Sequence, residues 1–289
     1  MNNRFVISYM PGVTWMHRLT GKTKVLLFMA MTVYIIATFD LRVMIPMFIL
    51  CVAIIISMKP NYKPILFMLG FLTLVSGVIG SLMVFFISPQ SGLTKCGMET
   101  IIWRYSEHLY LSKELLWYVG VMFFKRVCSL ATALVLVLSI TPSELAAGLN
   151  GVGLPYKVCI IVSLAFRTIP DIARDYADIN NSMQMRGLEL DKKRVSALQK
   201  LKQSTLMLVP LILSSFAKVE NISNSMDLRS FGKEKKRTWY SEHEPTRADK
   251  LMRVFILLLF LCALSYIVYF RILHPAPFDY WCPWVPRTW

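Results

Sequence analysis

The stretches INNSMQMRGL (residues 179–188) and ISNSMDLRSF (residues 222–231) are near copies that lie 43 residues apart in the chain. Five positions are identical, and both copies contain an arginine, Arg186 or Arg229, followed by a small residue. Each copy follows an apolar run that is too short to cross a bilayer. A protein that builds the same basic tip twice is expected to present it to two similar partners.

The composition favours a membrane protein. The chain has 289 residues, of which 55% are hydrophobic, and its mean hydropathy is +0.52. A soluble domain of this length forms an ample core with less apolar sequence. The net charge of +15 would suit nucleic acid, but no basic domain or aromatic–basic RNA motif stands apart from the apolar runs. We therefore expect a lipid bilayer, and no nucleic acid, as a partner.

Five runs approach the length of about 20 apolar residues that a transmembrane helix needs. We expect spans at Val25–Phe39 (slightly longer at either end), Arg42–Met58, Ile65–Ile87, Leu115–Ile140 and Leu251–Ile272. The fourth run contains Lys125 and Arg126. Because charges at membrane depth normally face protein or water, we expect these two to pair or to face the bundle rather than to form an ion pathway.

The distribution of charge predicts the orientation. Residues 1–24 carry four basic residues and no acidic one, and Lys59 and Lys63 follow the second span, whereas loop 88–114 balances three basic residues with three acidic ones. Positive charge concentrates on the cytoplasmic side. Five spans then place the N-terminus and residues 141–250 in the cytoplasm, with loop 88–114 and the Trp-rich tail outside.

The expected fold is all-α and polytopic, with three segments. Residues 1–140 hold the N-terminal segment and the first four spans, 141–250 form a cytoplasmic module of amphipathic helices, and 251–289 hold the last span and the external tail. We expect the protein in the cell membrane.

Three helices are expected in the cytoplasmic module. Thr141 is a candidate N-cap, with Pro142 at the first helical position and Glu144 completing a capping box, and this helix should stop at 148–153. A second helix should run from Pro155 to Met185 with a bend at Pro170.

The third helix should lead from the basic residues 192–202 through the apolar, Pro210-containing run 206–217 to Arg229. Gly187 after the first arginine, and Ser230 with Gly232 after the second, favour helix termination. Both arginines would then lie at helix C-terminal ends, where a cation is favoured.

An arginine there offers a planar, permanently charged fork for carboxylates or backbone carbonyls. At the end of a rigid helix it could anchor that helix in a partner's groove. The alternatives are that each arginine caps its own helix or contacts lipid phosphate. The duplication favours docking to a partner.

Catalytic signatures are lacking. Residues 21–23 resemble the end of a P-loop, but Met16 stands where the motif needs glycine, and Met98 replaces the lysine after Gly92 and Gly97. No HExxH, GxSxG or His/Cys metal-ligand cluster is present in the sequence, so we expect no enzyme, metal or cofactor. Any ATP that drives the protein should be bound by another chain.

The six cysteines lack CxxC spacing and four lie in apolar runs. We expect those four to be buried small hydrophobic residues. Cys96 and Cys282 both fall in external segments, where a disulfide is conceivable.

The chain resembles a known family, the transmembrane T subunits of energy-coupling factor (ECF) transporters. These transporters import vitamins and metal ions in bacteria and archaea. The resemblance rests on several motifs in the same order. They are HRLTGKTK (17–24), TPSEL (141–145), GLP (153–155), RTIP (167–170), MRGL (185–188) and LRSFG (228–232). It covers most of the chain apart from loop 88–114 and the tail after residue 273. The family's two signatures are usually Ala-Arg-Gly and a near copy, so Met185 and Leu228 depart from the pattern.

The resemblance implies a non-catalytic subunit. Two cytoplasmic ATPases, as a homo- or heterodimer, would dock on the helix ends formed by Met185, Arg186, Gly187, Leu228, Arg229 and Ser230. It also implies that a membrane-embedded, substrate-binding S subunit rests on the apolar helix faces, for ATP-driven uptake of a vitamin or other micronutrient. The candidate contacts are Val158, Ile161, Leu164, Leu208, Leu211 and Ile212.

Two other functions stay open at this point. One is a conventional ATP-driven permease with its own substrate path, and the other is a membrane scaffold without an ATPase partner. Methionine adapts its shape to exchangeable partners or fills a core. Both uses are open for Met183, Met185, Met207 and Met226.

Overall fold

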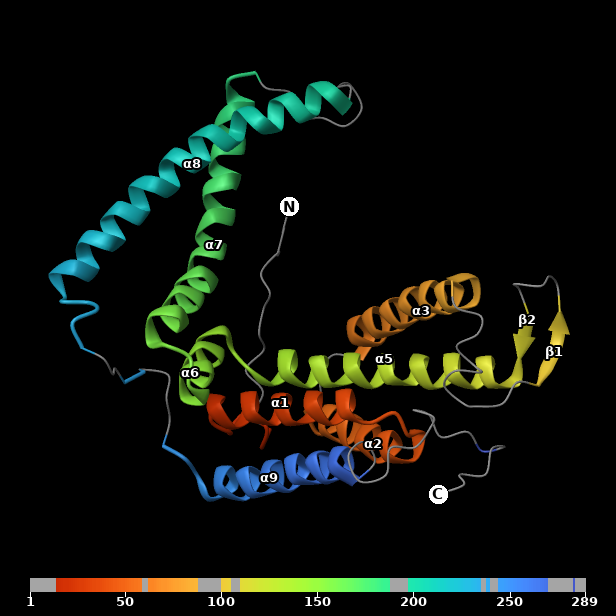
Figure 1. Ribbon diagram of the computed structural model, residues 1–289. Helices are drawn as coiled ribbons and strands as arrows, with labels where there is room; N and C mark the ends of the chain where they lie inside the picture. The colour runs from red at the N-terminus through yellow and green to blue at the C-terminus, as the bar shows by residue number, and fades with distance from the viewer. Residues whose placement is uncertain are drawn as a thin grey trace. The chain divides into compact units, whose positions relative to one another are not determined.

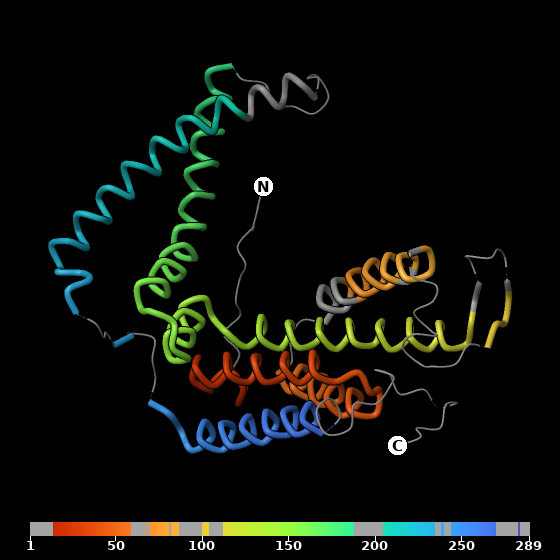
Figure 2. Tube along the Cα trace, in the orientation of Figure 1, coloured from red at the N-terminus to blue at the C-terminus, as the bar shows by residue number. Residues whose placement is uncertain are grey.

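The computed structural model describes residues 14–58, 62–87, 100–104, 110–187, 197–234, 238–239, 244–269 and 283 (Figure 1). The chain divides into two compact units, one within residues 145–242 and one within residues 9–144 and 243–289. Helices dominate both units (Figure 2). The fold is therefore all-α, as expected, while the division into three segments stays a prediction.

Each of the five expected spans is a helix in the second unit. They are α1 (Gly21–Ala37), α2 (Leu41–Met58), α3 (Tyr62–Ile87), α5 (Lys113–Ser139) and α9 (Arg247–Ile267). By length and composition, α2, α5 and α9 can cross a bilayer. In α3 the apolar stretch 70–86 has 17 residues, and α1 has 17 as well. The protein is thus a multi-pass membrane protein.

A fourth stretch, Thr205–Leu228, also meets the length and composition of a span. The sequence analysis expected its apolar part, residues 206–217, to be too short. The stretch is longer because the helix continues unbroken past Ala217 through a segment rich in uncharged Ser and Asn. Length and composition alone thus do not separate this helix from the spans.

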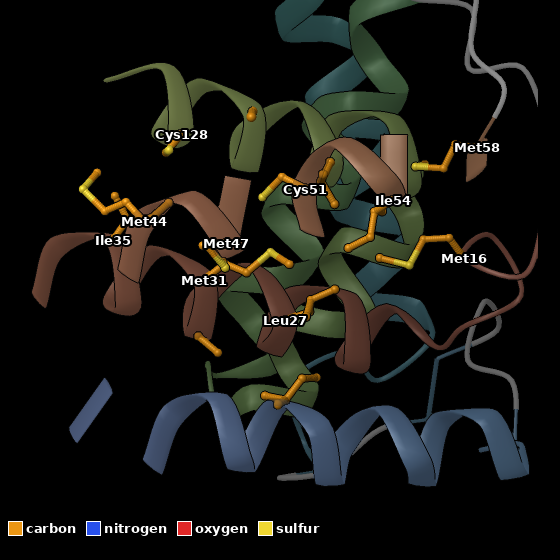
Figure 3. Close-up of a cluster of buried hydrophobic side chains, with 14 of the residues drawn as sticks. Met16, Leu27, Met31, Ile35, Met44, Met47, Cys51, Ile54, Met58 and Cys128 are labelled. Atoms are coloured by element: carbon orange, nitrogen blue, oxygen red, sulfur yellow. The ribbon is translucent and has the colours of Figure 1, made fainter. Parts of the chain in front are cut away.

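The core of this unit lies between α1, α2 and α5, with α9 packed on α1 (Figure 3). Methionine supplies a third of the buried cluster, which suits gap filling between helices because the side chain is unbranched and adaptable. The cluster comprises Met16, Leu19, Leu27, Ala30, Met31, Ile35, Met44, Met47, Cys51, Ile54, Met58, Cys128, Ala131, Val135 and Ile256.

The two charged residues inside α5 bind backbone carbonyls of neighbouring helices. Lys125 Nζ donates to the carbonyl oxygens of Ile36 and Thr38 at the end of α1, at 3.2 and 3.4 Å. Arg126 Nη1 donates to the carbonyl oxygen of Ser76 in α3, at 3.1 Å. The expectation that both side chains face the bundle is therefore confirmed, and their role is structural.

A buried ion pair joins the start of α1 to the start of α6 (Pro142–Val152). Lys24 Nζ lies 2.9 Å from Glu144 Oε2, with the two side chains 0% and 18% exposed, and it also donates to the carbonyl oxygen of His17. A Cβ on Gly21 would lie 2.3 Å from the Glu144 carbonyl oxygen, so only glycine permits this approach. Breaking such a pair leaves a buried charge uncompensated.

The capping box of α6 is present as expected. Glu144 N–H donates to Thr141 Oγ1 at 3.2 Å, and Thr141 N–H donates to Glu144 Oε2 at 3.3 Å. Glu144 therefore caps α6 and binds Lys24 with the same carboxylate.

A second capping box, between Thr246 and Asp249, starts α9. The other oxygen of Asp249 accepts from the N–H and hydroxyl of Thr20, which fixes α9 beside α1.

Two short strands were not expected in the loop between α3 and α5. β1 (Ile101–Arg104) and β2 (Tyr110–Ser112) pair antiparallel, and Ser112 caps α5 by accepting from the N–H of Leu115.

Two of the six cysteines, Cys96 and Cys282, lie outside the described residues, because only parts of this loop and of the tail are described. Of the four other cysteines, Cys262 is exposed, contrary to expectation, because it lies on a face of α9 that no other described helix covers; the other three are buried.

Candidate functional site

The two sequence copies occupy the last turns of two long helices in the first unit. These are α7 (Tyr156–Met185) and α8 (Ala197–Leu228), and they end within a residue of the expected limits. Both helices continue through the prolines at 170 and 210. The copies therefore form two helix C-termini, as the sequence predicted.

The end of α8 is a Schellman motif. Ser230 N–H donates to the Asp227 carbonyl oxygen at 2.9 Å, and Phe231 N–H donates to that of Met226 at 3.0 Å. Ser230 adopts a left-handed conformation with φ of +53°, which is unusual for a residue with a Cβ. The chain thus turns sharply away directly after Arg229.

The end of α7 uses the equivalent residues. Gly187 N–H donates to the Gln184 carbonyl oxygen at 3.0 Å, and Gly187 has a φ of +89°. Arg186 is the C-cap residue, with its N–H directed at the carbonyls of Ser182 and Met183. Gly187 and Ser230 therefore perform the same turn, and the expectation of helix termination at both places is confirmed.

Both arginines lie on the surface. Their preceding residues, Met185 and Leu228, are 84% and 88% exposed, and Arg186 and Arg229 are exposed as well. Among the described residues, neither guanidinium forms a hydrogen bond or an ion pair. The described contacts therefore give no support to the interpretation that the guanidinium of each arginine caps its own helix by binding the last backbone carbonyls.

α7 and α8 contact each other and cross near the C-terminal end of α7 (Figure 1). An ion pair also joins the two helices, since Lys218 Nζ of α8 donates to Asp175 Oδ2 of α7. Their side chains are 49% and 23% exposed, so the pair is accessible to solvent. Asp175 therefore pairs between helices, whereas Arg174 and Asp171 form a pair within α7.

An aromatic contact joins the start of α7 to the turn after α8. The rings of Tyr156 and Phe231 meet edge to face, with centroids 5.8 Å apart. Nearby, Trp239 Nε1 donates to Asn150 Oδ1 at 3.1 Å. The sequence analysis missed these contacts because they join positions 75 and 89 residues apart that no repeat relates; only the apolar Phe231, directly after the left-handed residue, is the kind of residue that packs at a Schellman motif.

The candidate S-subunit contacts are largely uncovered. Val158, Ile161, Leu208 and Ile212 are exposed, with Ile161 at 66%, whereas Leu164 and Leu211 are half-buried. Further exposed apolar residues extend both faces, namely Ile169, Ile172, Val209, Leu213, Phe216 and Val219. Of the methionines considered for a partner surface, Met207 is buried, Met183 and Met226 are half-buried, and Met185 is exposed. An apolar surface of this extent marks a contact with protein or membrane.

Comparisons with known proteins agree with this architecture. The CbiQ family, described as cobalt transport protein, matches residues 12–240. The chain is 25% identical to the energy-coupling factor transporter transmembrane protein EcfT of Lactococcus lactis subsp. cremoris (strain MG1363), over 90% of this chain and 96% of that protein. It is 27% identical to the EcfT of Heliobacterium modesticaldum (strain ATCC 51547 / Ice1), over 77% of this chain and 82% of that protein.

The family match includes both arginine-tipped helix ends and the Lys24–Glu144 contact, and it covers well over half of the chain. The two EcfT proteins align over 96% and 82% of their length. The chain therefore belongs to the CbiQ family of transporter membrane proteins.

Proposed function

We propose that this protein is the T subunit of an ECF transporter, which links two cytoplasmic ATPases to a substrate-binding S subunit. The observation that carries the proposal is the pair of matching helix ends. Each presents an exposed arginine directly before a left-handed turn, and neither guanidinium has a partner among the described residues. Two such ends suit two similar binding grooves.

Each arginine would insert into a groove on one ATPase. A guanidinium that becomes desolvated against carboxylates or carbonyl oxygens is a frequent hot spot. The bulky Met185 and Leu228, which stand where the family usually has alanine, would occupy the mouth of each groove. We therefore infer wider grooves in the ATPases of this system than in systems with alanine.

The exposed apolar faces of α7 and α8 would carry the S subunit. In this arrangement α8 lies at the membrane interface with its apolar half against lipid or the S subunit, although its length alone would allow a span. Closure of the ATPases on ATP would move the two helix ends and tip the S subunit, so that a vitamin or other micronutrient is released in the cytoplasm. The N-terminus and the α6–α8 segment face the cytoplasm in this proposal.

The test removes the two arginines and measures assembly. The full chain is expressed with the ATPase and S subunits of an ECF system from the same organism and purified through a tag on this chain. We expect Arg186→Ala with Arg229→Ala to lose ATPase co-purification and substrate uptake, with membrane insertion intact. Arg→Lys at both positions should rescue only in part, because an ammonium lacks the planar fork.

The matched control is Arg174→Ala, an exposed arginine of α7 whose described partner is Asp171 of the same helix. It should leave ATPase binding unchanged. Normal ATPase binding by the double arginine variant would contradict the proposal. Binding of ATPases with uptake in the absence of any S subunit would instead indicate a permease with its own substrate path.

A further inference from the structure

The two arginine-tipped helix ends lie in different surroundings. Phe231, two residues after Arg229, packs on Tyr156, which is the first residue of α7. The end of α8 therefore lies beside the start of α7. Arg186 is at the other end of α7, and a helix of 30 residues rises about 45 Å. The start of α7 is thus close to one arginine and far from the other.

Two further contacts join the segment after Arg229 to the same place. A Cβ on Gly232 would lie 4.0 Å from Lys157 Nζ, so this ammonium lies over the turn that follows α8. Trp239 Nε1 donates to Asn150 Oδ1 in α6 at 3.1 Å. The turn after α8, the end of α6 and the first turn of α7 therefore form one packed surface.

The end of α7 has no such neighbour in the part of the chain that the structure describes. A Cβ on Gly187 would meet no described atom from elsewhere in the fold within 4 Å, and Met185 is 84% exposed. The turns that follow the two arginines are equivalent, but their surroundings are not. Among the described residues, a partner that binds Arg229 therefore meets additional surface that a partner of Arg186 does not meet.

The surface beside Arg229 is basic and exposed. It consists of Leu154, Lys157, Arg229 and Lys233, and we call it the basal surface. Lys157 forms no ion pair with any residue that the structure describes. It also lies in the first turn of α7, where no acidic residue is present and a cation is electrostatically unfavourable. The stability of the helix therefore does not explain this lysine, whereas binding to an anionic group would.

We propose that the basal surface enlarges one of the two ATPase-docking sites. Lys157 and Leu154 contact the ATPase that binds Arg229, and they do not contact the ATPase that binds Arg186. Lys157 binds a carboxylate at the rim of the groove, and Leu154, which is 39% exposed, packs on an apolar residue beside it. The inference rests on the proposed function and adds that the two docking sites are unequal.

The size of stable interfaces supports an enlarged site. A specific complex buries about 800 Å² on each partner, contributed by about 20–30 residues, which is more than one helix end presents. The basal surface supplies part of this area next to Arg229, within the same compact unit. The phosphate of an anionic lipid is the other anion that Lys157 would bind, but such a contact would not depend on Arg229.

Titration of ATPase onto the full chain and its S subunit, in nanodiscs of phosphatidylcholine, measures the contribution of Lys157. We expect Lys157→Glu to weaken ATPase binding about tenfold, because two like charges then face each other. The loss should persist in the Arg186→Ala variant and should fall below about twofold in the Arg229→Ala variant, because the two helix ends act independently. Thermal unfolding should be unchanged, since glutamate suits the first turn of a helix.

Arg174→Glu is the matched control, because it makes the same change of charge at an exposed position of the same helix, 17 residues beyond Lys157. It should leave the affinity unchanged. The photocrosslinking residue p-benzoylphenylalanine should crosslink to an ATPase when it replaces Leu154 in the intact complex, and not when it replaces Arg174. The crosslink from position 154 should disappear with Arg229→Ala and persist with Arg186→Ala.

The inference is overturned if position 154 gives no ATPase crosslink, if Lys157→Glu weakens binding no more than Arg174→Glu, or if the loss is the same in both arginine variants. An effect of Lys157→Glu that is confined to nanodiscs with phosphatidylglycerol would assign the lysine to lipid and would also overturn it. Failure of the proposed function appears differently. In that case the wild-type chain binds no ATPase, or the chain without Arg186 and Arg229 binds it equally well.

Discussion

The helices around α1 and the α7–α8 pair place their polar contacts differently. Around α1, Lys24 and Glu144 form an ion pair with side chains 0% and 18% exposed, and Asp249 is fully buried between two threonines. In the α7–α8 pair, the ion pair between helices is half-exposed and large apolar faces are uncovered. The charged groups around α1 are thus satisfied by buried partners within their own unit, whereas the α7–α8 pair leaves its charged groups accessible to other molecules.

This difference separates residues that should matter for folding from residues that should matter for assembly. Substitution of Glu144 ought to lower the free energy of unfolding, and substitution of the two arginines ought to weaken binding to partner proteins. Both regions can be compared in purified, detergent-solubilised protein.

Glu144→Ala should be the most damaging single change. It leaves Lys24 buried without its carboxylate and also removes half of the capping box, so a loss of about 3 kcal/mol is expected. Asp175→Ala should cost less than about 1 kcal/mol, because that pair is partly exposed. Thermal unfolding of both variants checks this, and equal shifts in Tm would remove the distinction between the regions.

The aromatic contact at the base of α7 should have an intermediate effect. Phe231→Ala removes a half-buried ring from Tyr156 and should cost about 1–2 kcal/mol. Tyr156→Phe keeps the ring and removes a buried hydroxyl that has no hydrogen-bond partner among the described residues. It should be neutral or slightly stabilising, and a loss as large as that of Phe231→Ala would show that the hydroxyl has a partner.

The two helix ends should respond in opposite directions. Gly187→Ala places a Cβ at a φ of +89° and should destabilise by about 1 kcal/mol. Ser230→Gly relieves a left-handed serine at +53° and should stabilise by about 0.5 kcal/mol after the extra freedom of the unfolded glycine is counted. Denaturation of each single variant tests the sign, and a stabilising Gly187→Ala would contradict the equivalence of the two turns.

The smallest effect concerns pH at the start of α1. Burial, followed by repulsion from Lys24, lowers the pKa of His17 below its ordinary value of 6.5. The unfolded chain then binds a proton more readily than the folded one, so this contribution is complete above pH 6.5 and declines as the pH falls below it. His17→Gln should flatten part of the decline in stability between pH 7 and 5.5; an unchanged slope would exclude His17 as its source.

Much of this architecture could be predicted from the sequence because it depends on local patterns. Thr141, Pro142 and Glu144 encode a helix start, Gly187 encodes a stop, and long apolar runs encode the spans. The contacts between distant segments could not be predicted in the same way. Lys125 lies 87 residues from Thr38 in the chain, and no sequence pattern around either residue indicates that the two are in contact. The strands β1 and β2 were missed because they are too short to show a clear alternation.

The lysine in α5 has a consequence for how the protein meets the lipid. With 17 residues, α1 rises only about 26 Å, less than the roughly 30 Å of a hydrocarbon layer. At the end of α1, Lys125 Nζ donates to two backbone carbonyl oxygens and lies 3.6 Å from the centroid of the Phe39 ring. The hydroxyl of Tyr266 donates to Asp40 Oδ2 at 2.7 Å. The turn between α1 and α2 can therefore lie below the level of the lipid headgroups, because side chains of the protein bind its polar groups there. A helix as short as α1 then needs no local thinning of the bilayer.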